Sequence, residues 1–141
     1  MVLLASALSP MYDLSPALRH VSGQMYNFWS PLDVAILSVG TNLFGTMDGV
    51  KSPAAGFVGF FMPDSADDQL YRKLTQVSYD SAWAKLGNRG EHIGTMHEAF
   101  AKEIIAPLID DVPLTKVITS SAMVRSGGVR PPASTRPATR P

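Results

Sequence analysis

The chain has 141 residues, carries no formal net charge and contains no cysteine. This length is enough for one domain with a core, and the missing cysteine excludes disulfides, thiolate metal sites and a cysteine nucleophile. Charged residues make up only 17% of the chain, against about 25% in an ordinary globular protein. The low charge therefore predicts that a partner protein or lipid covers part of the surface.

The first predicted helix follows Ser15-Pro16, one of four Ser-Pro dipeptides in the chain. Proline holds the residue before it in extended geometry, which suits an N-cap, and it fits the first helical turn itself. Apolar residues then recur at helical spacing until Ser30-Pro31, where the next element begins. These residues are Leu18, Val21, Met25 and Phe28.

The second predicted helix starts at Ser30 and carries Asp33 at N3, where a negative charge favours a helix start. Apolar side chains cover more than half of its circumference. The rest is a small, uncharged polar stripe that suits close contact with a neighbouring protein. This stripe consists of Ser38, Thr41, Asn42 and Gly45.

A membrane span is not favoured within this apolar region. Residues 34–47 form a run of only 14 between Asp33 and Asp48, whereas a span needs about 20. Contact with lipid at the apolar segment 34–62 is left open.

Residues 64–88 predict a third helix, because three aspartates crowd its first turn as a helix N-terminus favours. Its apolar residues fall on two opposite faces. We therefore expect this helix to bend near Ser78 or to lie between two surfaces, with Trp83 contacting a neighbouring protein. The faces consist of Leu70, Leu74 and Val77 on one side and Tyr79, Trp83 and Leu86 on the other.

The fourth predicted helix begins at Glu91 and has the most regular apolar stripe, which Pro107 is expected to kink or end. Residues 114–124 fit a strand or a short helix equally well. The stripe consists of Ile93, Met96, Phe100, Ile104 and Leu108. The fold class expected from these elements is mainly α, a small irregular bundle of four to five helices.

Charge divides the chain into a helical body over 1–113, a connecting segment over 114–128 and an extended basic tail over 129–141. The body has seven Lys and Arg against twelve Asp and Glu, a net charge of −5, whereas residues 114–141 have five Lys and Arg and no acid. The tail is rich in proline and favours polyproline II. We expect it to dock on an acidic neighbour through Arg130, Arg136 and Arg140.

Motifs for catalysis or ligand binding are missing from the sequence, which has no G-x-S-x-G, P-loop or G-x-G-x-x-G. His92 and His97 are five residues apart, so on a helix they would not share a face as two metal ligands would. Basic residues are not interleaved with aromatic ones, so nucleic-acid binding is not favoured. The sequence predicts no catalytic residue, metal ligand, cofactor or small-molecule substrate.

The function expected from these patterns is that of a non-catalytic accessory subunit in a large protein assembly. An organellar membrane complex, for example mitochondrial, is slightly favoured, and a minor structural or cement protein of a virion is the alternative. A rival class is a small helical ligand-binding protein or enzyme whose site uses His97 or Asp80.

Overall fold

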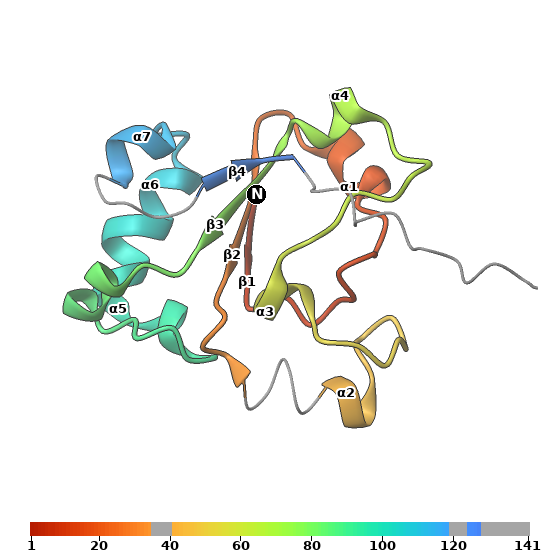
Figure 1. The fold of residues 1–141 in the computed structure, drawn as a ribbon. Helices are drawn as coiled ribbons and strands as arrows, with labels where there is room; N and C mark the ends of the chain where they lie inside the picture. The colour runs from red at the N-terminus through yellow and green to blue at the C-terminus, as the bar shows by residue number, and fades with distance from the viewer. Residues whose placement is uncertain (35–40, 119–123, 128–141) are drawn as a thin grey trace, which may run out of the picture.

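The computed structural model describes residues 1–34, 41–118 and 124–127, and it shows a mixed α/β fold (Figure 1). The prediction of a mainly helical bundle is therefore wrong. A four-stranded sheet runs through the molecule in the order β1-β2-β3-β4, with β1, β2 and β3 parallel and β4 antiparallel to β3. The strands are β1 Val2–Leu4, β2 Met25–Trp29, β3 Leu74–Ser78 and β4 Val124–Ser126.

Helices cover both faces of this sheet (Figure 1). One face carries α1 Ser15–His20, α3 Ala55–Val58 and α4 Asp68–Tyr71. The other carries the 3-10 helix Ser81–Leu86 and a longer helix built from α5 Glu98–Phe100, the π-helical turn Ala101–Ile105 and α6 Ala106–Ile109. The remaining short elements are α2 Thr41–Phe44, the 3-10 helix Gly94–Met96 and α7 Leu114–Val117.

Two hydrophobic clusters fill the layers, and residues on the two sides of β1, β2 and β3 enter opposite clusters. In β2, Met25 packs with α1 while Phe28 packs with the longer helix, and in β3 Leu74 and Val77 divide in the same way. The first cluster consists of Leu14, Leu18, Val21, Met25, Ala55, Phe60, Met62, Tyr71 and Leu74. The second consists of Phe28, Val77, Trp83, Phe100, Ile104, Ile105 and Leu108.

The predicted helix from Ser15 to residue 29 is correct only in its first part. α1 ends at His20, because Val21 is extended with φ −85° and ψ 119°, and the chain then turns and enters β2. The residues after the turn, MYNFW, are rich in aromatic side chains that favour a strand. Met25 and Phe28 continue a helical spacing by coincidence, since they face opposite layers.

The predicted helix over 64–88 is also wrong as a single element. A helix does begin among its three aspartates, but at Asp68 and not at Asp64. The Asp67 carboxylate caps this helix, α4, by accepting from the backbone N–H groups of Gln69 and Leu70. The chain then forms β3 and the 3-10 helix Ser81–Leu86. The residues of the two predicted apolar faces are therefore divided among α4, β3 and this 3-10 helix, with Tyr79 between the last two. Leu74 and Val77, predicted on one face, enter opposite clusters from β3, which is buried on both sides as is typical of parallel sheets.

The helix predicted in the 91–108 region is confirmed from Glu98 onward, and it ends at Ile109, two residues after Pro107. The turn before this proline is π-helical, with the Ala106 N–H donating to the Ala101 carbonyl. Proline has no N–H to donate and favours such an irregular turn.

The connecting segment over 114–128 was predicted to contain a strand or a short helix. It contains one of each, since α7 is helical and β4 is a strand. Because β4 pairs with β3, this segment is part of the folded body. Arg130, Arg136 and Arg140 lie outside the described residues, as does Ser38. No helix in the described ranges is long and apolar enough to cross a membrane.

Gln76 joins three parts of the fold from the middle of β3, where it is only 3% exposed. Its Oε1 accepts from the Phe60 N–H at 2.5 Å, and its Nε2 donates to the carbonyls of Phe60 at 2.9 Å and Gly127 at 3.3 Å. The side chain thus connects β3 to the segment after α3 and to the end of β4.

We expect Gln76→Ala to lower the free energy of unfolding by about 2 kcal/mol or more, because it leaves buried N–H and C=O groups without partners. Chemical denaturation measures this loss. The control is Thr75→Ala on the same strand, where only an exposed hydrogen bond to Gln24 is lost and less than about 1 kcal/mol is expected. Equal losses in both variants would contradict this role of Gln76.

Candidate active site

Residues at the carboxyl ends of the three parallel strands line one pocket. Ala5 follows β1, Ser30 and Asp33 follow β2, and Tyr79 follows β3, and all four line the pocket. Ligands of open α/β sheets bind outside this edge of the strands. The pocket is therefore the first place to look for chemistry.

Asp33 and His92 form a close pair in this pocket, called the Asp33–His92 pair below. The His92 Nδ1 lies 2.8 Å from the Asp33 Oδ2, and the two residues are 59 positions apart in the chain. The Asp33 side chain is 4% exposed, whereas the His92 side chain is 34% exposed. A carboxylate only accepts hydrogen bonds, so an ionised Asp33 accepts its bond from Nδ1–H, and in a neutral ring Nε2 then carries no proton and can act as a base.

A tight turn after β2 fixes Asp33. The Ser30 hydroxyl accepts from the Leu32 N–H at 3.1 Å, and the Ser30 carbonyl accepts from the Asp33 N–H at 3.2 Å. The Ser30 N–H in turn donates to the Gly56 carbonyl in α3. Asp33 was predicted to be a helix-start charge, and it does directly precede the helical residue Val34. Its carboxylate also contacts a histidine from another part of the chain.

The loop after the 3-10 helix Ser81–Leu86 positions His92. Asn88 is 2% exposed, and its Oδ1 accepts from the Gly90 N–H at 2.9 Å. Gly90 has φ +86°, and a Cβ there would lie 2.9 Å from the Ser30 Oγ. Only glycine lets this loop lie so close to the turn that carries Asp33.

Aromatic rings form the wall beneath the Asp33–His92 pair. Trp83 is 5% exposed and lies 5.9 Å from Phe28 and 5.2 Å from Phe100, measured between ring centroids. The prediction that Trp83 contacts a neighbouring protein does not fit this burial. Its ring instead packs within the chain and lines the pocket.

The pocket is narrow, with an empty volume of about 310 Å³ including the part open to solvent. The Thr95 hydroxyl on its wall is buried and has no hydrogen-bond partner among the described residues. Burial raises the pKa of the Tyr79 hydroxyl, and the charges of Glu91 and Asp80 raise it further. The pocket is thus lined by the His92 imidazole, the Tyr79 phenol and the Thr95 hydroxyl, which has no partner among the described residues.

The ligand-site candidates from the sequence lie elsewhere. Asp80 caps the 3-10 helix Ser81–Leu86 by accepting from the Ala82 N–H. His97 is half exposed, with its Nε2 3.9 Å from the Glu91 carboxylate. In the part of the chain that the structure describes, no group of three or more His, Asp or Glu could hold a metal ion.

The polar contact stripe predicted on the second helix is only partly described. α2 is four residues long, and Gly45 follows its end with φ +91°. Asn42 is exposed. Whether Thr41, Asn42 and Gly45 contact a neighbouring protein stays a prediction.

Comparisons of this chain with protein-family models, with curated proteins and with solved structures found no match. The function of this chain is therefore inferred from the site itself. Its two main residues were missed because Asp33 and His92 were each assigned to a helix. Had MYNFW and LTQVS been recognised as parallel strands, the polar residues after them would have been expected at one edge.

We expect Gly90→Ala to disturb the site beyond the strain of an alanine at positive φ. The control is Gly49→Ala, where φ is +80° and an added Cβ meets nothing within 4 Å. Both variants should lose about 1 kcal/mol of stability from strain. Only Gly90→Ala should lose stability beyond this amount, and only in this variant should the NMR signals of the His92 ring shift. Equal stability losses and unchanged His92 signals in both variants would contradict the close packing at Gly90.

Proposed function

We propose that this chain supplies the acid and base of a hydrolytic active site that acts on esters or related acyl compounds. The Asp33–His92 pair is the observation that carries the proposal. In such a site the aspartate orients the imidazole, stabilises its protonated form and remains ionised itself. His92 then removes a proton from a hydroxyl nucleophile through Nε2 and returns it to the leaving group.

The order and placement of the two residues support this reading. Asp33 follows β2 and His92 follows β3, so the acid precedes the histidine in the chain and both lie at the carboxyl edge of a parallel sheet. Triads built on parallel sheets in α/β-hydrolases have this order, with the nucleophile on an earlier strand. The support is geometric, because the same chemistry also occurs on unrelated folds.

The nucleophile in this proposal comes from a strand beside β1. No hydroxyl of the described residues is hydrogen-bonded to the Nε2 of His92. Among the described strands β1 pairs with β2 alone, and its sequence, VLL, is wholly apolar. An apolar parallel strand favours a neighbour on its free edge, and a further parallel strand there would also end beside the pocket.

The test uses the native protein, with any segment or partner that accompanies residues 1–141 kept in place. We expect hydrolysis of p-nitrophenyl butyrate, together with labelling of one serine or threonine hydroxyl by a fluorophosphonate. Asp33→Asn and His92→Gln should each lower kcat/KM by about 100-fold or more. The first removes the group that orients the histidine, and the second removes the base itself.

The matched control is His97→Gln, which removes a half-exposed histidine outside the pocket and should leave kcat/KM unchanged. Circular dichroism establishes that each variant is folded. Hydrolysis and labelling that persist in both Asp33→Asn and His92→Gln would contradict the proposal.

A second candidate function is the accessory subunit expected from the sequence. It is favoured by apolar side chains that α2 and the following turn leave in solvent: Leu43 is 63% exposed, Phe44 89% and Met47 83%. Exposed apolar groups of this size favour burial against a partner. The two functions are compatible, since a catalytic chain can belong to an assembly.

The size of the native particle tests this second function. Light scattering should give a mass well above 15.2 kDa if neighbours cover this surface, and replacing Phe44 by serine should reduce the mass. A stable monomer of the native chain would contradict the accessory-subunit function.

A further inference from the structure

Phenylalanine, tyrosine and tryptophan side chains line the pocket that contains the Asp33–His92 pair, called the active-site pocket below. The ring centroid of Trp83 lies 6.1 Å from that of Tyr79, with 78° between the ring planes, and 5.9 Å from that of Phe28, with 54° between the planes. These rings are tilted against one another and not stacked, so they form separate walls. The aromatic lining consists of Phe28, Trp29, Tyr79 and Trp83.

Carboxylates supply the charge of the active-site pocket. Asp33 and Glu91 line it, and among the described residues no Lys or Arg does. The lining therefore has a net charge of −2 when His92 is neutral and −1 when the imidazole is protonated. A pocket with this charge favours a cationic ligand over an anionic one such as a phosphate ester.

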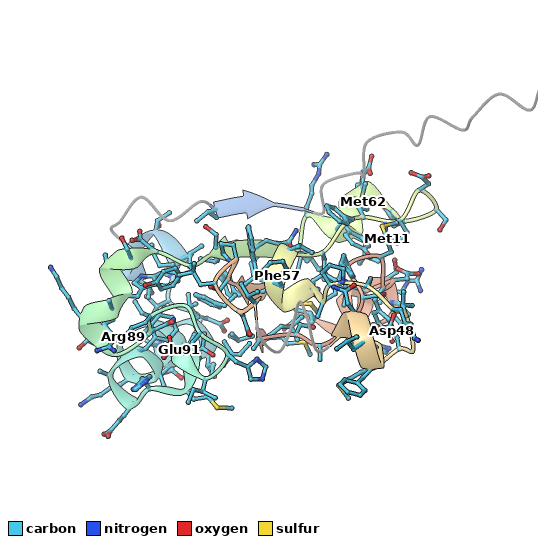
Figure 2. The ribbon with its side chains drawn as sticks, turned by 60° about the horizontal axis from the view of Figure 1, so that its bottom comes forward. Met11, Asp48, Phe57, Met62, Arg89 and Glu91 are labelled. Carbon is cyan, nitrogen blue, oxygen red and sulfur yellow. The ribbon has the colours of Figure 1, made fainter. Side chains whose placement is uncertain are left out.

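Arg89, in the loop before Glu91, does not reverse this charge. Its side chain is exposed and outside the lining, and its backbone N–H donates to the Glu91 carboxylate at 3.0 Å. Figure 2 shows Arg89 with Glu91 at the end of the molecule away from Asp48. Burial and then the charges of Glu91 and Asp80 raise the pKa of Tyr79, and the opposite effect of Arg89 is smaller. The nearby charges thus make the potential at Tyr79 negative.

The polar side chains of the wall leave few free acceptors for a cation that carries N–H groups. Four of them already accept a hydrogen bond from within the chain, and the Thr95 hydroxyl is without a partner among the described residues. Primary ammonium and guanidinium groups have several N–H donors that need acceptors, whereas a quaternary ammonium group has none. Aromatic rings attract a quaternary ammonium group through their faces. The four accepting side chains are Ser30, Asp33, Asn88 and Glu91.

We infer that the active-site pocket binds the quaternary ammonium group of a cationic ester, with the reacting carbonyl of the same molecule beside His92. The inference depends on the proposed function and names its substrate class. A water molecule in the liquid takes up about 30 Å³. The pocket has an empty volume of about 310 Å³ including the part open to solvent, which gives room for a trimethylammonium group.

Binding is tested with tetramethylammonium on the native protein, and tert-butanol serves as an uncharged molecule of similar size. Trp29 and Trp83 are the two tryptophans of the chain and both line the pocket, so tryptophan fluorescence reports on it directly. At constant ionic strength, tetramethylammonium should bind about fivefold or more tightly than tert-butanol, because the aromatic rings and the carboxylates attract only the cation. Pivalate, an anion of similar shape, should bind more weakly than both.

Two variants separate the charge from the aromatic wall. Glu91→Gln keeps an acceptor for the Arg89 N–H but removes one charge, so it should weaken tetramethylammonium binding about threefold and leave tert-butanol binding unchanged. Trp29→Leu should also weaken binding of the cation, because it replaces an aromatic ring by an aliphatic group. The matched control is Glu98→Gln, an exposed glutamate outside the pocket, which should change neither ligand's binding.

A kinetic readout links the cation to the reaction. Acetylcholine and 3,3-dimethylbutyl acetate have the same shape, and only acetylcholine carries a charge. The native protein should have the higher kcat/KM for acetylcholine. Glu91→Gln should reduce this preference about threefold, and Glu98→Gln should preserve it.

Other outcomes distinguish the inference from the function on which it depends. Equal binding of tetramethylammonium and tert-butanol would overturn the inference, as would cation binding that neither Glu91→Gln nor Trp29→Leu weakens. Tighter tetramethylammonium binding after deletion of residues 129–141 would also overturn it, because the arginines of the tail would then be the native occupant. Selective binding of the cation without any effect of Asp33→Asn on ester hydrolysis would leave the cation site in place and overturn the proposed function.

Discussion

A parallel sheet has to be covered on both faces, and most features of this fold follow from that constraint. Each crossover returns the chain to the same end of the sheet and deposits helices on its faces. Here α1, α3 and α4 pack on one side and the longer helix Glu98–Ile109 on the other. The parallel strands β1, β2 and β3 therefore place apolar side chains in both layers, and their carboxyl ends all point to one edge.

The candidate site is a consequence of this shared edge. Asp33 and His92 are 59 residues apart in the chain, and neither lies within a strand, but the loops after β2 and β3 bring them to within 2.8 Å. The turn at Ser30 and the glycine at position 90 set the distance between the two loops. The buried aspartate keeps a hydrogen-bond partner in His92, and the histidine side chain stays 34% exposed.

The sequence alone predicted some local features well and the architecture poorly. A helix start among the aspartates after Pro63 and a helix within the region from Glu91 to Leu108 were predictable, because capping residues and a regular stripe are local signals. The observed helices begin later than predicted, at Asp68 and Glu98. The strands were not recognised, since Met25 and Phe28, or Leu74 and Val77, are spaced three apart and fit a helix as well as a strand buried on both sides. That error hid the site, because Asp33 and His92 become neighbours only when the strands before them are parallel.

The protonation of the His92 ring tests the account most directly. If Asp33 holds Nδ1, nitrogen NMR of the neutral ring should find the proton on Nδ1 and a bare Nε2, and Asp33→Asn should alter this tautomer. Two results would contradict an acid–base role of the Asp33–His92 pair. One is a neutral His92 with its proton on Nε2, and the other is a set of ring nitrogen signals that Asp33→Asn leaves unchanged.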